Sequence, residues 1–128
     1  SDMLRDKDSS AIVAVSDSTR AKAFYQDTLE LELTEDNQQV LVFRTGTTNL
    51  VVYVSEFAGT NKANAVVWGV GEEIETIVER LGNKGVTFER YDGMDFADGI
   101  HRDGAFRAVW LKDPDGNILH LNRMPDSY

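Results

Sequence analysis

Short apolar blocks alternate with polar turn residues along the first half of the chain. Residues 10–15 are mostly apolar, which is typical of a short buried strand. Between about 19 and 29 the apolar residues recur at i, i+3, i+4 and i+8, which predicts an amphipathic helix after the N-cap candidates Ser16-Asp17-Ser18. Alternation and flanking turn residues predict three further strands, at 31–34, 39–44 and 50–54.

The second half of the chain repeats this order of blocks. A predicted strand at 65–70 precedes a helix that opens at Gly71 and ends before Gly85, whose missing side chain suits a helix C-terminus. Three more strands are predicted at 86–91, 106–112 and 118–123, with a long acidic loop at 92–103 after the first of them.

The two halves align with one another in sequence. A shift of about 55 places lays Val15 on Val70 and Glu30 on Gly85. A shift of about 68 lays the turn at 45–49 on the turn at 113–117, and the extra residues are the 92–103 loop. We therefore predict an α+β fold of two β-α-β-β-β modules, which share one sheet surface because neither can bury its apolar residues alone.

The stretch from Lys112 to Leu121 joins the last two predicted strands. Asp113-Pro114 suits the start of a tight turn because proline fixes φ, and Asp115-Gly116-Asn117 tolerates positive φ. His120 is a polar residue within the outgoing apolar strand. A histidine at such a place is more often structural than catalytic, but one that faces a pocket would bond a polar ligand group near neutral pH.

Composition excludes several classes of function. The chain has 128 residues and a net charge of −9, which argues against nucleic-acid binding because phosphate recognition needs clustered Lys and Arg. No apolar run approaches the length of about 20 residues that a membrane span requires, and no signal peptide is visible. The absence of cysteine excludes disulfides and thiolate sites and fits a cytoplasmic location.

Four motifs resemble the vicinal-oxygen-chelate superfamily, which holds glyoxalase I, bleomycin-resistance proteins and extradiol dioxygenases. They are Val15-Ser16-Asp17, the segment 23–29, Gly85-Val86 and the segment 110–117. Ala58-Gly59-Thr60-Asn61 with Trp68 further resembles an uncharacterised glyoxalase-like subgroup of small proteins. The resemblance implies a curved, partly open mixed β-sheet barrel with its helices outside, and it speaks to fold more than to chemistry.

This interpretation divides the chain into a short N-terminal segment and one domain. Residues 1–9 are expected to be disordered or tag-derived. Residues 10–125 are expected to form a single glyoxalase/bleomycin-resistance-like domain, with module one at about 10–57, a connector at 58–64 and module two at about 65–125.

The resemblance also locates a possible metal site. Metal-using members place His or Glu at four equivalent strand positions, which fall here on Ser10, near Val52, on Ala65 (or Asn64) and on His120. Of these, His120 alone is a competent ligand, whereas a divalent site generally needs about three. We therefore expect no resident metal or other cofactor, with His120 as the ligand if a metal is held, and no glyoxalase I activity.

Four more residues are candidates for lining a pocket. Trp68 could stack on a flat ligand. His101, in the long loop, is expected either as a solvated residue or as part of a lid over the pocket. Arg107 and Val109 would share a face with His120 if the last hairpin pairs Leu111 with Ile118, and Arg107 could then meet an anionic ligand.

The expected function is metal-independent binding of a small, partly apolar molecule in the concave sheet. One alternative is a metal-dependent lyase, isomerase or dioxygenase-like enzyme whose site is displaced or shared across a dimer. Another is a dimeric interaction module with a vestigial pocket. The expected partners are a small-molecule ligand and a second copy of the chain, with no nucleic acid and no membrane.

Overall fold

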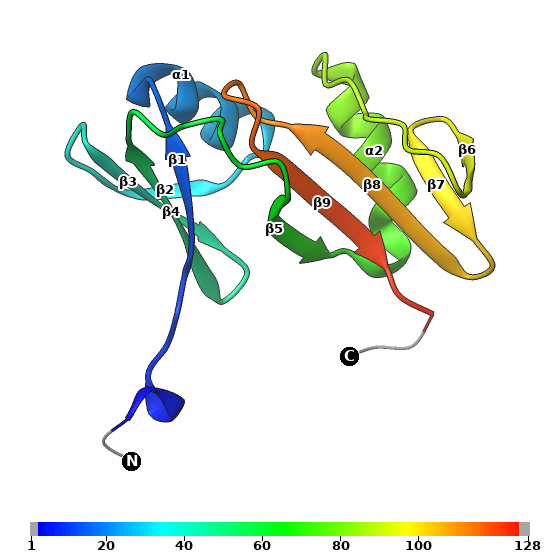
Figure 1. Cartoon of the computed structure of the whole chain (residues 1–128), viewed down its shortest axis with the longest axis horizontal. Helices are drawn as coiled ribbons and strands as arrows, with labels where there is room; N and C mark the ends of the chain where they lie inside the picture. The colour runs from blue at the N-terminus through cyan, green and yellow to red at the C-terminus, as the bar shows by residue number, and fades with distance from the viewer. Residues whose placement is uncertain (1–2, 126–128) are drawn as a thin grey trace.

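The computed structural model describes residues 3–125, which form two modules of like topology (Figure 1). Ser1 and Asp2, part of the N-terminal segment expected to be disordered or tag-derived, lie outside the described residues, and Leu4–Asp6 forms a single 3-10 turn, η1. Module one contains β1 (Ala11–Val15), α1 (Ser18–Lys22), η2 (Ala23–Thr28), β2 (Glu32–Asp36), β3 (Val40–Thr45) and β4 (Thr48–Val54). Module two contains β5 (Asn64–Gly69), η3 (Gly71–Glu73), α2 (Ile74–Asn83), β6 (Asp95–Ala97), β7 (Ile100–Asp103), β8 (Phe106–Lys112) and β9 (Ile118–Arg123).

Each module builds its own mixed sheet, and the predicted α+β class is confirmed. The strand order is β1-β4-β3-β2 in module one and β5-β9-β8-β7-β6 in module two. The first strand of each module pairs in parallel with the last, β1 with β4 and β5 with β9, while the other pairs are antiparallel. The two sheets form no closed barrel, and β1 and β5 lie at their adjoining edges (Figure 1).

The first helix starts from a side-chain cap and ends in a wider coil. Asp17 accepts hydrogen bonds from the backbone N–H groups of Thr19 and Arg20, which satisfies donors that a helix start leaves free. From Ala23 the coil continues as a π-helix, η2, in which Leu29 N–H donates to the Phe24 carbonyl at 3.0 Å. The predicted helix at 19–29 is therefore confirmed, with a change of helical type midway.

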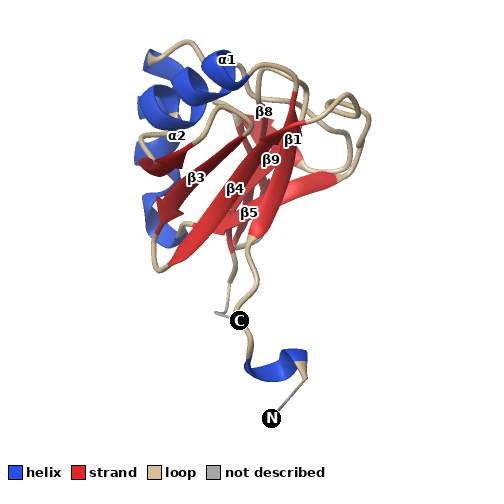
Figure 2. Cartoon of the chain, turned by 90° about the vertical axis from the view of Figure 1, so that its left-hand side faces the viewer, coloured by secondary structure: helices blue, strands red, loops and turns tan. Residues whose placement is uncertain are grey.

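Both helices lie on the same side of the strands (Figure 2). We call the faces of the two sheets that look toward the helices the helix-side face, and the opposite faces the open face. Alternation along the strands gives the helix-side face the buried apolar residues of one shared core: Val13, Val15, Leu41, Phe43, Leu50, Val52, Val109, Leu111, Leu119 and Leu121. The open face carries partly exposed apolar residues, including Ile12 and Val67, with 59% and 52% of their surface accessible.

The segment 86–103 is where the strand prediction was wrong. Residues 86–91 form no regular strand and pair with β8 by one bridge, from Phe88 to Leu111, and by a bond from Glu89 N–H to the Trp110 carbonyl. The predicted loop at 92–103 instead contains the hairpin β6–β7, and β7 pairs with the other end of β8. The outer edge of β8 is thus shared by two segments, so neither extends along its whole length.

Candidate functional site

The turn after β8 fastens the two modules together. Asp113, which is buried, accepts a hydrogen bond from the Tyr25 hydroxyl of module one at 2.7 Å. Asn117 donates from Nδ2 to the Ala14 carbonyl of module one and to the Asp113 carboxylate, both at 2.8 Å. Burial and the Asp113 carboxylate raise the pKa of Tyr25, so its hydroxyl stays protonated and donates. Asp113 and Asn117 therefore serve the structure of the molecule.

The second carboxylate of this turn also reaches module one. Asp115 accepts from the Ser16 N–H at 3.1 Å, from the Ser16 hydroxyl at 2.6 Å and from the Arg20 guanidinium at 3.0 Å. The connector packs against the same turn. Gly59 has a φ of 79°, and a Cβ at this position would lie 2.5 Å from the Asp115 carbonyl oxygen. The turn is thus held by module one and covered by the connector.

His120 lies on the open face of β9, away from the helices. Its ring stacks on Trp110 of β8, with centroids 4.6 Å apart and an interplanar angle of 17°. Nδ1 lies 3.1 Å from the Val109 carbonyl, which accepts a hydrogen bond, so Nδ1 carries the proton and Nε2 is an acceptor. Burial lowers the pKa of His120, which keeps the imidazole neutral. Nε2 accepts a long hydrogen bond from Asn122 Nδ2 at 3.3 Å.

A hollow opens beside His120 between β5 and β9. Asn122 and His120 supply its polar atoms, and the Asn122 Oδ1 is buried with no hydrogen-bond partner among the described residues. Apolar side chains make up most of the remainder; the full lining is Asn64, Ala65, Val66, Val67, Phe106, His120, Asn122 and Met124. The hollow therefore has one acceptor, Asn122 Oδ1, that the described residues leave unpaired in partly apolar surroundings, which suits a ligand with an O–H or N–H group.

His101 lies in neither of the two positions predicted for it. It is fully buried in β7, so it is neither solvated nor part of a lid. Its Nε2 accepts from the Tyr91 N–H at 2.9 Å, and its Nδ1 is buried without a partner in the part of the chain that the structure describes. Its ring packs against Tyr91, Phe96 and Trp110, with centroids 4.7–6.1 Å away. This aromatic cluster covers the outer strands of module two on the open face.

Three other predicted pocket residues lie on the wrong side of their strands. The last hairpin pairs Leu111 with Leu119 rather than with Ile118, so Val109 and Leu111 face the helices and not the His120 side. Arg107 follows the same alternation and donates to carbonyl groups in the β7–β8 turn. Val52 is buried in the core on the helix side of β4. A shift of one residue in register moves a side chain to the opposite face of a sheet, which is why Arg107 and Val109 were placed on the wrong face.

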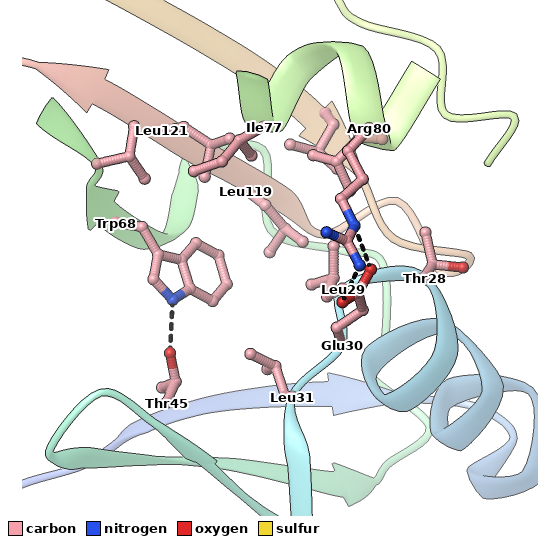
Figure 3. Close-up of a pocket in the computed structure, with 13 residues that line it drawn as sticks. Thr28, Leu29, Glu30, Leu31, Thr45, Trp68, Ile77, Arg80, Leu119 and Leu121 are labelled. Carbon is pink, nitrogen blue, oxygen red and sulfur yellow. Dashed lines mark hydrogen bonds and ion pairs between the residues drawn. The ribbon is translucent and has the colours of Figure 1, made fainter. Parts of the chain in front are cut away.

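A second, deeper cavity lies between the modules on the helix side (Figure 3). It has a volume of about 290 Å³ and a mostly apolar lining. Its lining residues are Thr28, Leu29, Glu30, Leu31, Thr45, Trp68, Val70, Ile77, Arg80, Leu81, Leu111, Leu119 and Leu121. The predicted pocket residue Trp68 lies here, away from His120, and its indole Nε1 donates to the Thr45 hydroxyl at 2.9 Å.

Three charged side chains lie at one end of this cavity. The Arg80 guanidinium donates to both oxygens of Glu30, at 2.7 and 2.9 Å, and Lys84 lies 2.6 Å from the same carboxylate. Lys84, together with Arg80, holds the pKa of Glu30 below its ordinary value. Glu30 has a φ of 62°, a left-handed backbone conformation that residues other than glycine rarely adopt. These ion pairs connect module one to α2 of module two.

Comparison with known proteins decides the family. The model of the Glyoxalase/Bleomycin resistance protein/Dioxygenase superfamily matches residues 9–121. The chain belongs to this superfamily. The superfamily resemblance read from the motifs is thereby confirmed. A comparison with curated protein sequences gives no match.

Solved structures of superfamily relatives share the fold at low sequence identity. The fosfomycin resistance protein FosX from Listeria monocytogenes (hexagonal form) has a TM-score of 0.74 and 16% identity, covering 93% of each chain. A lactoylglutathione lyase from Agrobacterium tumefaciens has a TM-score of 0.71 and 17% identity, covering 94% of this chain and 96% of the other. A glyoxalase/bleomycin resistance protein/dioxygenase from Alicyclobacillus acidocaldarius gives 0.73 and 16%, covering 97% and 96%. Such identities carry the fold and not the activity.

The four superfamily metal positions do not form a donor set in this chain. Ser10 is exposed just before β1, Val52 is in the core, and Ala65 lines the hollow near His120 with a methyl group. Among residues 3–125, no group of three or more His, Cys, Asp or Glu side chains could hold a metal ion. One neutral imidazole does not fit a divalent site, which generally needs about three protein ligands.

Several site residues escaped the sequence analysis. Asn122 could have been found, because it follows His120 by two places in a strand and must share its face. Glu30 and Arg80 carry no such signal, because they are 50 residues apart and meet only when the modules pack.

No helix within the described part of the chain is long and apolar enough to cross a membrane.

Proposed function

We propose that this superfamily member binds a small, partly apolar organic molecule in the open-face hollow beside His120, without a resident metal ion. The observation that carries the proposal is one acceptor without a partner within residues 3–125, Asn122 Oδ1, beside the neutral His120 imidazole and among apolar side chains. An O–H or N–H group on the ligand would satisfy the Asn122 oxygen, which is otherwise a buried acceptor without a partner.

The test follows the indole N–H signal of Trp110 by NMR during titration. Trp110 stacks on His120, so it reports on this face. The probes are phenol, which can donate a hydrogen bond, and anisole, its methyl ether, which cannot. We expect phenol to shift the Trp110 signal saturably and to bind several-fold more tightly than anisole. The variant Asn122→Leu should remove that preference. Equal binding of the two probes, or no response of Trp110, would contradict the proposal.

Elemental analysis of the purified protein tests the metal-free part of the proposal. We expect no stoichiometric zinc, nickel, manganese or iron after dialysis, and no thermal stabilisation by these ions. A ligand at about 100 times its dissociation constant adds roughly 2.7 kcal/mol of stability, which a thermal melt detects readily. Stoichiometric metal that is lost in His120→Ala would favour instead a metal-dependent enzyme whose site is completed across a dimer.

A homodimer remains part of this proposal. Ile12, Tyr53 and Val67 leave apolar surface exposed on the open face, where a second copy could cover it. Sedimentation equilibrium of the wild type and of Ile12→Lys distinguishes the states. We expect a dimer that the lysine weakens, and a wild-type monomer would remove this part of the proposal. The cytoplasmic location also stays a prediction.

A further inference from the structure

We propose that the cavity between the modules on the helix side is a second binding site, which takes a small monocarboxylate with an apolar body. The cavity (Figure 3) lies on the helix side of the sheets and shares no lining residue with the open-face hollow beside His120, so the two are separate. Its volume of about 290 Å³ is at the small end of the range for ligand pockets, about 300–1,000 Å³.

The cavity has one charged acceptor among its lining residues, the Glu30 carboxylate, which Arg80 and Lys84 already bind. It has donors at Thr45 and Arg80. The Thr45 oxygen accepts from the Trp68 indole at 2.9 Å, which leaves the Thr45 hydroxyl hydrogen to donate. Arg80 uses Nε and Nη2 on Glu30, and its remaining nitrogen, Nη1, points toward the space beside Trp68 in Figure 3. Nη1 has no hydrogen-bond partner among the residues that the structure describes. The Arg80 side chain is 69% exposed at the mouth of the cavity, so a ligand oxygen would reach Nη1 from solvent.

The charge at the mouth of the cavity favours an anion. Arg80 and Lys84 bring two positive charges, and Glu30 brings one negative charge that both of them already bind. The local balance is one unneutralised positive charge at a solvent-exposed mouth, where most of the Arg80 side chain is exposed. A carboxylate matches a guanidinium in charge and geometry. The leucines and Trp68 would then hold a short alkyl or aryl body by burial.

The conformation of Glu30 supports a constructed site. At the equivalent place in module two the chain has Gly85, with a φ of 90°, whereas Glu30 holds a φ of 62° with a side chain in place. Left-handed backbone is disfavoured for a residue with a Cβ. The Glu30 carboxylate orients Arg80 by two hydrogen bonds, so the strained residue positions the donor that the ligand would meet.

The experiment uses the full chain and its two tryptophans, which report on opposite faces. Trp68 lines this cavity and Trp110 stacks on His120, and Trp110→Phe assigns their indole N–H signals. The probe is 2-naphthoate, and its neutral counterpart is 2-naphthylmethanol. We expect 2-naphthoate to shift the Trp68 signal saturably with no change at Trp110, and to bind several-fold more tightly than the alcohol.

Two charge variants and one filling variant identify the contacts. Arg80→Gln should weaken 2-naphthoate roughly tenfold and leave 2-naphthylmethanol unchanged. Lys84→Gln removes a positive charge that pairs with the same Glu30 carboxylate but does not line the cavity, so it should weaken 2-naphthoate by less than Arg80→Gln does. Ile77→Phe fills the cavity without changing charge and should abolish the shift at Trp68.

Three results would overturn the proposal. One is a Trp68 signal that never responds, and another is equal binding of the acid and the alcohol in wild type and Arg80→Gln. The third is a shift of Trp110 alone, which would place the probe on the open face and leave the proposal for that face standing. Conversely, failure of phenol to move Trp110 has no bearing on this cavity.

Discussion

The two modules share a topology but differ at equivalent places. Near the end of β3 in module one, Thr45 faces the helix side and accepts a hydrogen bond from Trp68 of module two. Directly after β8 in module two, Asp113 faces the same side and accepts from Tyr25 of module one. The equivalent positions therefore have the same kind of contact in both modules. In each case an oxygen of one module accepts a hydrogen bond from an aromatic side chain of the other.

The turns that carry these oxygens have different roles. In module one, β3 and β4 are joined by the two residues Gly46 and Thr47, and a Cβ at Gly46 would meet nothing within 4 Å. In module two the turn spans residues 113–117, is bonded to module one and is covered by the connector. The longer turn thus joins the modules by several hydrogen bonds, whereas the shorter one contributes the bond between Thr45 and Trp68. The repeat sets the path of the chain in both modules. Contacts between the two modules then decide which turn residues contribute most to stability.

The largest expected effect is the loss of Asp113. This carboxylate also accepts from the backbone N–H groups of Asp115 and Asn117. Asp113→Ala should cost about 3 kcal/mol in the free energy of unfolding, because it leaves buried donors unpaired. Thr45→Val, its module-one counterpart, should cost about 1 kcal/mol. Urea denaturation measures both, and equal losses would show that the two turns contribute alike.

Next in size is the packing of the connector against the longer turn. Gly59→Ala forces a Cβ against the Asp115 carbonyl at a positive φ, and we expect a loss of about 2–3 kcal/mol. The control is Gly46→Ala, which has a positive φ and open space around it and should lose about 1 kcal/mol. Thermal unfolding measures both losses. If the two variants have the same melting temperature, the close approach at Gly59 is relieved by a shift of the loop.

A smaller difference separates the two helix starts. Asp17 caps the first helix by two hydrogen bonds, whereas the second helix begins with the 3-10 turn Gly71–Glu73 and has no side-chain cap. Asp17→Ala should destabilise the protein by about 1 kcal/mol. Glu73→Ala should change stability by less than half of that. Thermal unfolding of the two variants at the same pH measures this contrast, and an equal effect would contradict it.

The smallest expected effect is a pH dependence that arises from module two. Burial lowers the pKa of His120 in the folded protein below the value of about 6.5 for an unperturbed histidine. The unfolded chain then binds more protons, so stability is present above pH 6.5 and declines as the pH falls from there toward the folded-state pKa. Urea denaturation between pH 7.5 and 5.5 should reveal this decline, and His120→Gln should reduce it. An unchanged slope in the variant would assign the decline to other groups.

Much of the arrangement of helices and turns could be predicted from the sequence, because it depends on the local pattern of residues. The helix stripe, the Asp17 cap, the Gly85 helix end and the turn at 113–117 are set by residues close to one another in the chain. The repeat shift of about 55 paired Glu30 with Gly85, and both have positive φ in the structure. The prediction of a strand at 86–91 was wrong because β7 pairs with much of the edge of β8 that residues 86–91 would have needed.

The functional site depends on contacts that the sequence did not reveal. A one-residue error in the register of the last hairpin moved Arg107 and Val109 to the wrong face, since strand side chains alternate with a period of two. The cavity on the helix side is lined by residues of both modules, and Glu30 and Arg80, which are 50 residues apart, meet at its end. Local periodicity therefore predicted the modules, and the resemblance of short motifs indicated the superfamily that the family model confirms. The tertiary packing of one module on the other decided which side chains line a pocket, because distant contacts leave no local signal.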